Sequence, residues 1–352
     1  MRAVEWNPIG PAVRVIDQRQ LPARVECLDL LTVDDVADAI NGMTVRGAPT
    51  IGATAAFGLA LAAHASDAVD LSELWEEMAR AARRLQAARP TAINLAWALE
   101  RITRRVREVA PTSVGAAQAA FLHQAQRLAD DEVARNRRIG LHGAALLNDG
   151  DTLIHHCHTG GLAAVDYGTA LGIVRAAHEQ GKRLHVLVDE TRPRLQGSRL
   201  TAWELQQLGI SFEIIADGAA GTFLRRGEVQ VVLVGADRVA ANGDVVNKIG
   251  TYMLALAASA SRVPFYAVFP TSTVDLECPD GDAIPIEDRP AEEILALSID
   301  GQPAAPAGSR ARNPAFDVTP HALITALVTE AGVHRPPFEA ALRRATQEGM
   351  SA

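Results

Sequence analysis

The stretch HHCHTGGLA, residues 155–163, places one cysteine among histidines and shortly before two glycines. Histidines and a thiol together suggest a metal site. A thiol at the end of an apolar strand, followed by glycines, instead suggests a catalytic thiol beside a turn that can bind an anion. Cys157 also has a simpler interpretation, because many cysteines are only small, buried hydrophobic residues.

The metal interpretation is the weakest of the three. Successive strand side chains point to opposite faces, so His155 and His156 cannot both face one ion from a regular strand. His158 has no partner at a metal-ligand spacing, since the chain contains no CxxC or HExxH motif. Neither a dinucleotide fingerprint nor a P-loop is present. We therefore predict a protein that needs no metal and no cofactor.

Carboxylates follow several apolar, β-branched runs in the second half of the chain. Asp189 and Glu190 follow HVLV, Asp217 follows EIIA, and Asp237 follows VVLVGA. Desolvation at such a position raises the pKa of a carboxyl group, which keeps a proton available near neutral pH. Asp237 is therefore a candidate general acid, and the alternative is that it caps the turn ADRVAANGD.

Basic and small residues in several loops suggest an anion site. A helix start offers unpaired N–H groups and the positive end of the helix dipole, and a turn such as VRGAPTIG leaves N–H groups free. Each basic residue alone is more often a surface charge, but their joint placement before helices favours phosphate binding. Asn247 and Lys248 are expected to open a helix in NGDVVNKIGTYML. The other candidates are Arg46, Gly47, Ala48, Arg192, Arg194, Gln196 and Arg199.

Composition narrows the class of protein. The chain has 352 residues, of which 48% are hydrophobic and 22% charged, and its formal net charge is −8. It has no run of Lys and Arg, so we expect no nucleic-acid partner. The first residues lack an apolar signal core, and no apolar stretch reads as a membrane span. The cysteines, Cys27, Cys157 and Cys278, are odd in number and far apart, which favours a reducing cytoplasm.

The order of elements predicts an α/β fold in three parts. Residues 1–110 read as a mostly helical domain with a small strand region around AVRVI and helices near Thr32, 50–64, 71–88 and Pro90. Residues 111–149 read as a connecting helix. Residues 150–352 alternate apolar strands with helices, which predicts a Rossmann-like catalytic domain with a parallel sheet covered on both faces. Ligands of such sheets lie beyond the carboxyl ends of the strands.

Motifs along nearly the whole chain carry a family resemblance. VRGAPTIG, RPTAINLAWAL, HCHTGGLA, DETRPRLQGSRLTAWEL, GADRVAANGDVVNKIGTY and NPAFDVTPHALITALVTEAGV resemble methylthioribose-1-phosphate isomerases, in that family's order. The superfamily also holds ribose-1,5-bisphosphate isomerases and regulatory subunits of the eukaryotic translation-initiation exchange factor. The resemblance implies an isomerase of methionine salvage that acts on a sugar phosphate and forms a homodimer.

The same resemblance implies roles for matched residues. Asp237 is the implied proton donor, and Cys157 is the second catalytic residue, which supports the transition state or moves the proton. The phosphate-binding residues that it implies are Arg46, Gly47, Ala48, Arg89, Gln196, Asn247 and Lys248. Where the family usually has Asn after the cysteine, this chain has His158, and an imidazolium there would favour the thiolate of Cys157.

The candidate acid and thiol suit the conversion of an aldose to a ketose. Three other functions remain possible from the sequence. The anomeric carbon of an aldose 1-phosphate is locked as an ester, so an acid at the ring oxygen would help to open the ring. A proton or a hydride then moves from C2 to C1. The open alternatives are an isomerase of 5-deoxyribose 1-phosphate or ribose 1,5-bisphosphate, a noncatalytic regulatory subunit, and a nucleotide-binding oxidoreductase on a similar sheet.

Overall fold

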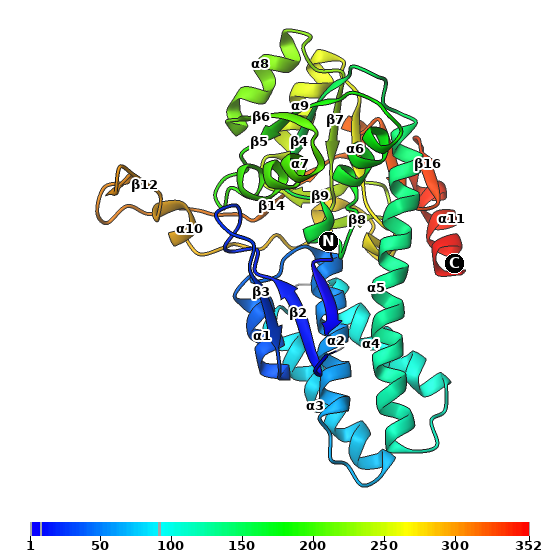
Figure 1. Cartoon of the computed structure of the whole chain (residues 1–352). Helices are drawn as coiled ribbons and strands as arrows, with labels where there is room; N and C mark the ends of the chain where they lie inside the picture. Colours follow the sequence, from blue (N-terminus) through cyan, green and yellow to red (C-terminus); the bar gives the residue numbers. More distant parts are fainter. Residues whose placement is uncertain (1, 8, 91–92, 352) are drawn as a thin grey trace. The chain divides into compact units, whose positions relative to one another are not determined.

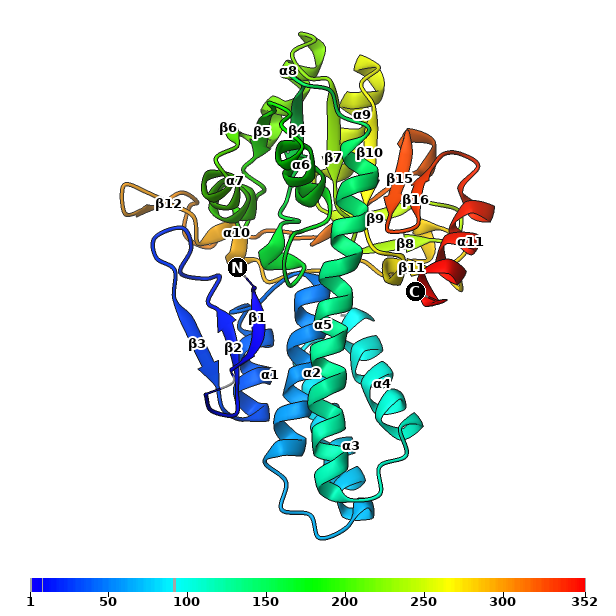
Figure 2. The same ribbon diagram turned by 45° about the vertical axis from the view of Figure 1, so that its right-hand side comes forward.

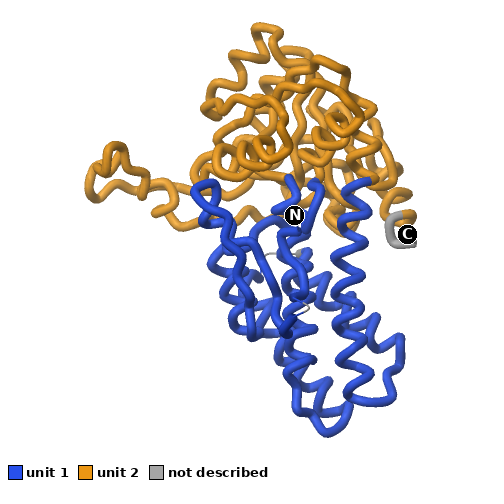
Figure 3. The backbone as a smooth tube through the Cα atoms, viewed as in Figure 1, with its two compact units in different colours: residues 1–137, 160–168 blue, residues 138–159, 169–352 orange. Residues whose placement is uncertain are grey.

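A computed structural model describes residues 2–7, 9–90 and 93–351. The chain forms two compact units (Figure 3). Unit 1 comprises residues 1–137 and 160–168, and unit 2 comprises residues 138–159 and 169–352. The short segment 160–168 therefore belongs to unit 1, although the chain on both sides of it belongs to unit 2.

Unit 1 is mainly helical, as the sequence predicted. Its centre is α2 (Ala48–His64), which is buried along most of its length. Its small residues let neighbouring elements approach closely. At Gly58, for example, an added Cβ would lie only 2.9 Å from Val36 Cγ1. The other helices of unit 1 lie around α2 (Figure 2) and contribute apolar side chains to the same core. They are α1 (Val33–Asn41), α3 (Leu71–Ala88), α4 (Ile93–Glu108) and α5 (Val114–Ala144), the last of which continues into unit 2.

A capping box sets the start of α1. Thr32 Oγ1 accepts a hydrogen bond from the N–H of Asp35 (3.1 Å), and Asp35 Oδ2 accepts one from the N–H of Thr32 (2.9 Å). These two bonds satisfy donors that a helix terminus leaves unpaired, which confirms the helix predicted from Thr32. Helix α4 is described from Ile93. Its predicted start near Pro90 involves residues 91 and 92, which lie outside the described residues.

A three-stranded antiparallel sheet completes unit 1. Its strands are β1 (Val4–Asn7), β2 (Ala12–Ile16) and β3 (Cys27–Leu30), in that order. Strand β2 is the strand predicted from AVRVI. Val13 and Val15 of this strand are buried and belong to the same core as α2. The sheet therefore packs on the helices of unit 1 rather than standing as a separate layer.

Unit 2 is built on a seven-stranded sheet in the order β16-β15-β10-β7-β4-β5-β6 (Figure 2). All neighbouring pairs are parallel except β15 with β16. The six parallel strands thus have the chain order 3-2-1-4-5-6 of a Rossmann fold. Their bounds are β4 (Thr152–His156), β5 (His185–Asp189), β6 (Ser211–Ile215), β7 (Val231–Val234), β10 (Phe265–Val268), β15 (Ala326–Thr329) and the antiparallel β16 (Gly332–His334).

Both faces of this sheet are covered, as predicted. Alternate residues such as Ile154, Val232 and Val234 share a core with helices of unit 2, while the other set, such as Leu153 and Leu233, is equally buried. Near-continuous apolar strands are the sequence signature of that arrangement. The helices of unit 2 are α6 (Ala170–Glu179), α7 (Ala202–Leu208), α8 (Ala220–Arg225), α9 (Thr251–Ser261), α10 (Glu292–Leu295) and α11 (Phe338–Ser351).

A second, four-stranded sheet in unit 2 was not predicted. Its order is β11-β8-β9-β14, with bounds β11 (Val274–Asp275), β8 (Arg238–Ala240), β9 (Val245–Lys248) and β14 (Phe316–Thr319). The prediction that Asn247 and Lys248 open a helix was wrong, because both residues end β9. Gly250, with a φ of 104°, turns the backbone after β9, and α9 therefore begins only at Thr251.

A small arm projects from the body of unit 2 (Figure 1). It contains α10 and a hairpin of β12 (Ser298–Ile299) and β13 (Gln302–Pro303). Ile299 is exposed at the hairpin. Among the described residues, no helix combines the length and the apolar character needed to cross a bilayer.

Candidate active site

The carboxyl ends of β4 and β7 lie side by side at the centre of the parallel sheet. His156, the last residue of β4, is paired with Val234, the last residue of β7. Strand order reverses between these two strands, and open α/β sheets bind ligands in the crevice at such a switch point. Cys157 follows β4 directly, and Asp237 follows β7 within three residues. The topology therefore brings the two predicted catalytic residues to the same edge of the sheet.

Cys157 has an unusual backbone conformation for a residue other than glycine. Its φ is +69°, in the left-handed region, and the residue is only 7% exposed. The N–H of Cys157 donates to Thr191 Oγ1 (3.0 Å), and its carbonyl accepts from Thr201 Oγ1 (2.8 Å). A conformation of this kind costs about 1–3 kcal/mol and persists where the surroundings enforce it, often at functional sites.

The loop after β5 supplies a polar partner to the thiol. The side-chain amide of Gln196 donates a hydrogen bond to Cys157 Sγ (3.3 Å). Gln196 is buried and immediately precedes a π-helical turn, η2 (Gly197–Thr201). The loop packs tightly, because a Cβ added at Gly197 would lie 1.8 Å from the carbonyl oxygen of Asp189. The rare π-turn thus places both Gln196 and Thr201 against Cys157.

Asp237 and Lys248 lie at neighbouring strands of the small sheet, Asp237 directly before β8 and Lys248 at the end of β9. The N–H of Asp237, directly before β8, donates to the carbonyl of Val246 in β9 (2.9 Å). Lys248, at the end of β9, is 8% exposed. Burial lowers the pKa of the Lys248 ammonium group, and the charges of Cys157 and Asp237 oppose this effect. These electrostatic interactions show that the thiol, the carboxyl group and the ammonium group converge in unit 2.

Asn247 is buried, but its amide has a structural partner. Asn247 Nδ2 donates to Thr251 Oγ1 (3.0 Å), and the same hydroxyl donates to the carbonyl of Lys248 (2.6 Å). These bonds hold the turn between β9 and α9. The geometry therefore places Asn247 beside Lys248 along the chain, and one of its amide hydrogens is used within this turn.

The other predicted phosphate residues belong to unit 1. Gly47 is the N-cap of α2 with a φ of +94°, and Ala48 is the first residue of that helix. A Cβ added at Gly47 would lie 2.3 Å from the carbonyl oxygen of Ala163, so only glycine fits there. Arg46 directly precedes this cap. Arg89 is the C-cap of α3, where its N–H donates to the carbonyl of Gln86 (3.3 Å).

The glycine-rich segment after Cys157 packs against the start of α2 within unit 1. The Leu162 carbonyl accepts hydrogen bonds from Gln18 Nε2 (2.8 Å) and Thr50 Oγ1 (3.0 Å), and Thr50 Oγ1 accepts one from the N–H of Val165 (2.8 Å). The close approach of Gly47 to Ala163 belongs to the same contact. The glycines of TGGLA therefore serve a tight packing of two backbone segments, which a sequence pattern alone does not distinguish from an anion cradle.

The three histidines around Cys157 have separate partners. His155 Nδ1 lies 2.9 Å from the carbonyl of Leu233, and burial lowers the pKa of His155 to about 3. His156 lies between Asp189 and the carbonyl of Ile249. His158 Nε2 pairs with Glu204 Oε1 (2.8 Å). His155 and His156 thus point to opposite faces of the sheet, as the strand alternation predicted.

The remaining strand-end acids have structural partners. Asp217 accepts hydrogen bonds from the N–H groups of Thr191 and Arg192 (both 2.7 Å), and Asp189 binds His156 Nδ1 (2.9 Å). His156, Asp189 and Asp217 lie within ligand distance of one another. His156 bonds to Asp189, and Asp217 bonds to backbone N–H groups, so we interpret the group as a polar network, in which Asp189 Oδ1 is buried without a hydrogen-bond partner. Asp237, the other predicted acid, lies directly before β8, and its role as a proton donor stays a prediction.

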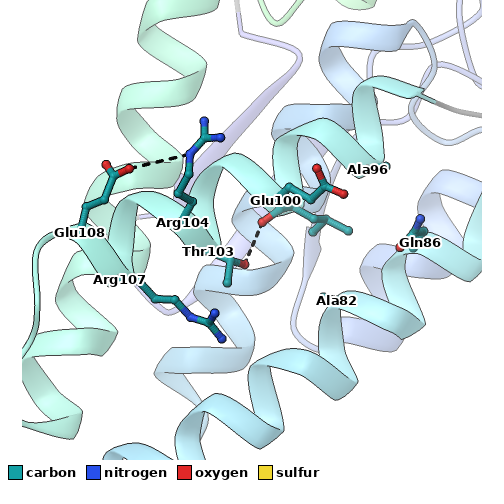
Figure 4. Close-up of a pocket in the computed structure, with 9 residues that line it drawn as sticks. Ala82, Gln86, Ala96, Glu100, Thr103, Arg104, Arg107 and Glu108 are labelled. Carbon is teal, nitrogen blue, oxygen red and sulfur yellow. Dashed lines mark hydrogen bonds and ion pairs between the residues drawn. The ribbon is translucent and has the colours of Figure 1, made fainter. Parts of the chain in front are cut away.

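A cavity of about 560 Å³ between α3 and α4 in unit 1 holds none of the predicted residues (Figure 4). Several polar groups that line the cavity already bind one another. Arg104 pairs with Glu108 (3.8 Å), and Thr103 Oγ1 donates to the Leu99 carbonyl (2.8 Å). The lining offers no thiol, histidine or strand-end acid. The cavity is lined by Ala82, Gln86, Ala96, Leu99, Glu100, Thr103, Arg104, Arg107 and Glu108.

Comparison with known proteins decides the family. The model of the initiation factor 2 subunit family matches residues 44–336. A methylthioribose-1-phosphate isomerase from a Synechococcus strain is 50% identical over 335 residues, which cover 95% of both chains. The chain belongs to the methylthioribose-1-phosphate isomerases of this family. This confirms the resemblance predicted from the sequence motifs.

Solved structures of family members share the fold over almost the whole chain. The 5-methylthioribose 1-phosphate isomerase of Pyrococcus horikoshii is 43% identical, with a TM-score of 0.91 and coverage of 99% of this chain and 96% of that one. An A. fulgidus protein described as the delta subunit of the translation initiation factor eIF-2B is 41% identical, with a TM-score of 0.88 and coverage of 99% of both chains. The same fold therefore occurs in a protein described as an isomerase and in one described as a translation-factor subunit.

Sequence reasoning missed three residues that hold the thiol and its strand. Thr191 and Thr201 bind the backbone of Cys157, and His156 links its strand to Asp189. Thr191 follows the strand-end acids in DETR, so its place after a strand was a usable signal. Thr201 lies 44 residues after Cys157 in a turn whose π-helical form has no sequence signature.

Proposed function

We propose that this chain converts 5-methylthioribose 1-phosphate, an aldose, into 5-methylthioribulose 1-phosphate, a ketose, in methionine salvage. One observation carries the proposal beyond the family name. Cys157 is held in a left-handed conformation at the switch point, with a Gln196 amide on its sulfur and with Asp237 and Lys248 close enough to interact electrostatically. A noncatalytic subunit would not need a thiol in that arrangement.

The proposed reaction begins with ring opening. Asp237 donates a proton to the ring oxygen as the bond between that oxygen and C1 breaks, which frees the C4 hydroxyl group. The positive character that develops at C1 makes the hydrogen on C2 mobile. Asp237 is exposed directly before β8, and its position supports this step, because it follows β7 at the carboxyl edge of the sheet, within electrostatic range of the buried Lys248.

Hydrogen transfer from C2 to C1 completes the isomerisation. In the proposed route, Cys157 removes a proton from C2 to give an enol. The enol becomes the C2 ketone as the same proton is added at C1 and the C2 hydroxyl group gives its proton to the carboxylate of Asp237, which restores the acid. The substrate and product have the same atoms, so the route needs no oxidant or reductant. A C2-deuterated substrate distinguishes this route from direct hydride transfer, because only the proton route can exchange deuterium with solvent.

The sugar phosphate needs cationic and N–H donors that hold it in place. We propose that Lys248 binds the phosphate as the cation nearest to the reacting groups and that Gln196 orients the thiol. A bound dianion would offset the burial that lowers the pKa of Lys248. The remaining proposed donors are Arg46, the N–H groups of Gly47 and Ala48, Arg89 and Asn247.

A substrate panel that differs only at C5 tests the proposed function. We expect kcat/KM to be highest for 5-methylthioribose 1-phosphate and lower for 5-deoxyribose 1-phosphate and ribose 1,5-bisphosphate. A charged C5 phosphate as the best substrate would assign the related bisphosphate reaction instead. No turnover of any of the three would favour a regulatory subunit, the alternative suggested by the name of the A. fulgidus relative.

Replacement of Arg46, Arg89 or Lys248 by Ala is expected to raise KM by about 10- to 100-fold, because a hydrogen bond to a charged group contributes about 1.5–3 kcal/mol. Steady-state kinetics measures this effect. Arg104→Ala and Arg107→Ala, at exposed positions of α4, are the matched controls. A phosphate-free sugar should bind poorly to the wild-type protein and no worse to the variants. Equal losses for both ligands would mean that the three residues only maintain the fold.

A homodimer and a cytoplasmic location remain predictions. Helix α9 is apolar on its outer side as well, where Tyr252, Met253 and Leu256 are exposed. An outward apolar face of this kind suits contact with a second copy of the chain. Sedimentation equilibrium of the purified protein measures the oligomeric state directly.

A further inference from the structure

His156 links two elements of the proposed site. It ends β4, and its ring is 1% exposed. Nδ1 lies 2.9 Å from Asp189 Oδ2, and Nε2 lies 2.9 Å from the carbonyl oxygen of Ile249. Gly250 packs on the ring edge so closely that a Cβ there would lie 2.9 Å from His156 Cε1. The ring thus spans from the end of β5 to the turn that follows β9.

These contacts define the protonation of the ring. A backbone carbonyl only accepts hydrogen bonds, so Nε2 must carry a proton. Nδ1 faces a carboxylate, and the proton between them belongs on the more basic imidazole. Burial alone would lower the pKa of His156, but the hydrogen bond and charge of Asp189, together with the charge of Asp217, raise it. Burial also raises the pKa of Asp189, so the two hydrogen bonds of the ring are the observation that favours an imidazolium paired with Asp189.

The two ends of this link are the neighbours of two proposed reacting groups. His156 directly precedes Cys157, and Ile249 directly follows Lys248. On the other side of the same turn, Asp317 accepts hydrogen bonds from the N–H groups of Gly250 (2.7 Å) and Tyr252 (3.1 Å). The turn after Lys248 is therefore held from both sides, by the buried His156 of β4 and by the half-buried Asp317 of β14.

We propose that His156, charged by its pairing with Asp189, is a positioning residue that fixes Lys248 relative to Cys157. This role rests on the proposed isomerase function. The link does not touch the substrate, and it acts through the Ile249 carbonyl and the backbone of β4. A displacement of about 1 Å in a site of this kind can cost about 10²-fold in rate.

Two substitutions separate the two hydrogen bonds of the ring. In His156→Gln the amide nitrogen can reach the position of Nε2 and keep the bond to the Ile249 carbonyl. In His156→Asn it can take the position of Nδ1 and keep only the bond to Asp189. We expect kcat/KM to fall about 10²-fold in His156→Asn, mainly through KM. We expect a smaller loss in His156→Gln.

His155 is the matched control, because it is equally buried on the same strand and points to the other face. His155→Gln and His155→Asn should lower the melting temperature as much as the His156 variants do, while KM changes less than threefold. Similar changes of KM for both histidines, or equal activity of His156→Asn and the wild-type enzyme, would overturn the positioning role.

Nitrogen-15 NMR of histidine-labelled wild-type protein tests the charge without a substrate. At pH 7 we expect two protonated ring nitrogens for His156 and one for His155, whose pKa is lowered to about 3 by burial. An unprotonated ring nitrogen at His156 would overturn the ion pair, even if the variants fail to fold. If the wild-type protein isomerised no sugar phosphate, the proposed function would fail, whereas the NMR result would still decide the state of His156.

Discussion

Replacing Cys157 with Ser is expected to lower kcat by about 10²–10⁴-fold, the usual contribution of a general acid or base, while KM changes only a few-fold. Serine matches the thiol in size and keeps the strand-end backbone, but its hydroxyl group is a far weaker acid and cannot form an anion near neutral pH. The hydrogen bonds of Thr191 and Thr201 to the backbone of residue 157 do not depend on the sulfur. The fold of the site should therefore survive the change.

Steady-state kinetics with 5-methylthioribose 1-phosphate measures this effect. Cys278→Ser is a matched control, because Cys278 is also a buried free thiol. It packs in an apolar cluster with Ala240 and Val246, and its sulfur donates to the carbonyl of Asp280 (3.2 Å). We expect Cys278→Ser to keep the wild-type kcat. A Cys157→Ser variant that kept more than roughly a tenth of the wild-type kcat would exclude the thiol as the hydrogen-transfer group.

Asp237→Asn is expected to cut kcat by about 10²-fold or more with little change in melting temperature. Asparagine keeps the shape of the side chain and its hydrogen-bonding capacity, but it has no proton to give to the ring oxygen. The backbone bond of residue 237 to Val246 is unaffected by the change. The pH–rate profile should also lose one limb, since the group whose titration produces that limb is gone.

Asp275→Asn supplies the control for Asp237. Asp275 lies in β11 of the same small sheet and pairs with Arg238, the residue next to Asp237. Its replacement should lower the melting temperature and leave both limbs of the pH–rate profile. If Asp237→Asn instead kept a normal kcat and lowered the melting temperature by several degrees, Asp237 would be a turn cap. The proton donor would then have to be sought elsewhere at the carboxyl edge of the sheet.

Much of the fold was predictable because its signals are local. Runs such as VVLV and HVLV are continuous in β-branched and leucine residues, and they alternate with helical segments. That pattern requires a parallel sheet with both faces covered. The start of α1 was equally local, because Thr32 and Asp35 exchange their hydrogen bonds within one turn. Strand ends also located Cys157 and Asp237, since ligands of such sheets lie at the carboxyl edge.

The small sheet could not be predicted because its partners are far apart in the chain. Strand β9 pairs with β14, and Lys248 lies opposite Phe316. A short run such as VVNK before a glycine is compatible with a strand or with the start of a helix. This run forms a strand because it pairs with the distant β14 and because the positive φ of Gly250 ends it there. The location of Lys248, and thus of the proposed phosphate cation, follows from that pairing.

The chain order of residue types determined the sheet, the edge that carries the candidate site and the family, because each depends on patterns within a few residues. Tertiary structure decided which partners surround each strand-end group. Asp189 and Asp237 follow similar strands, but Asp189 is paired with His156 from the neighbouring strand, whereas Asp237 lies with Lys248 and Cys157. Hydrogen-bond partners drawn from distant segments fix the charge and orientation of a buried polar group, and no local pattern specifies them.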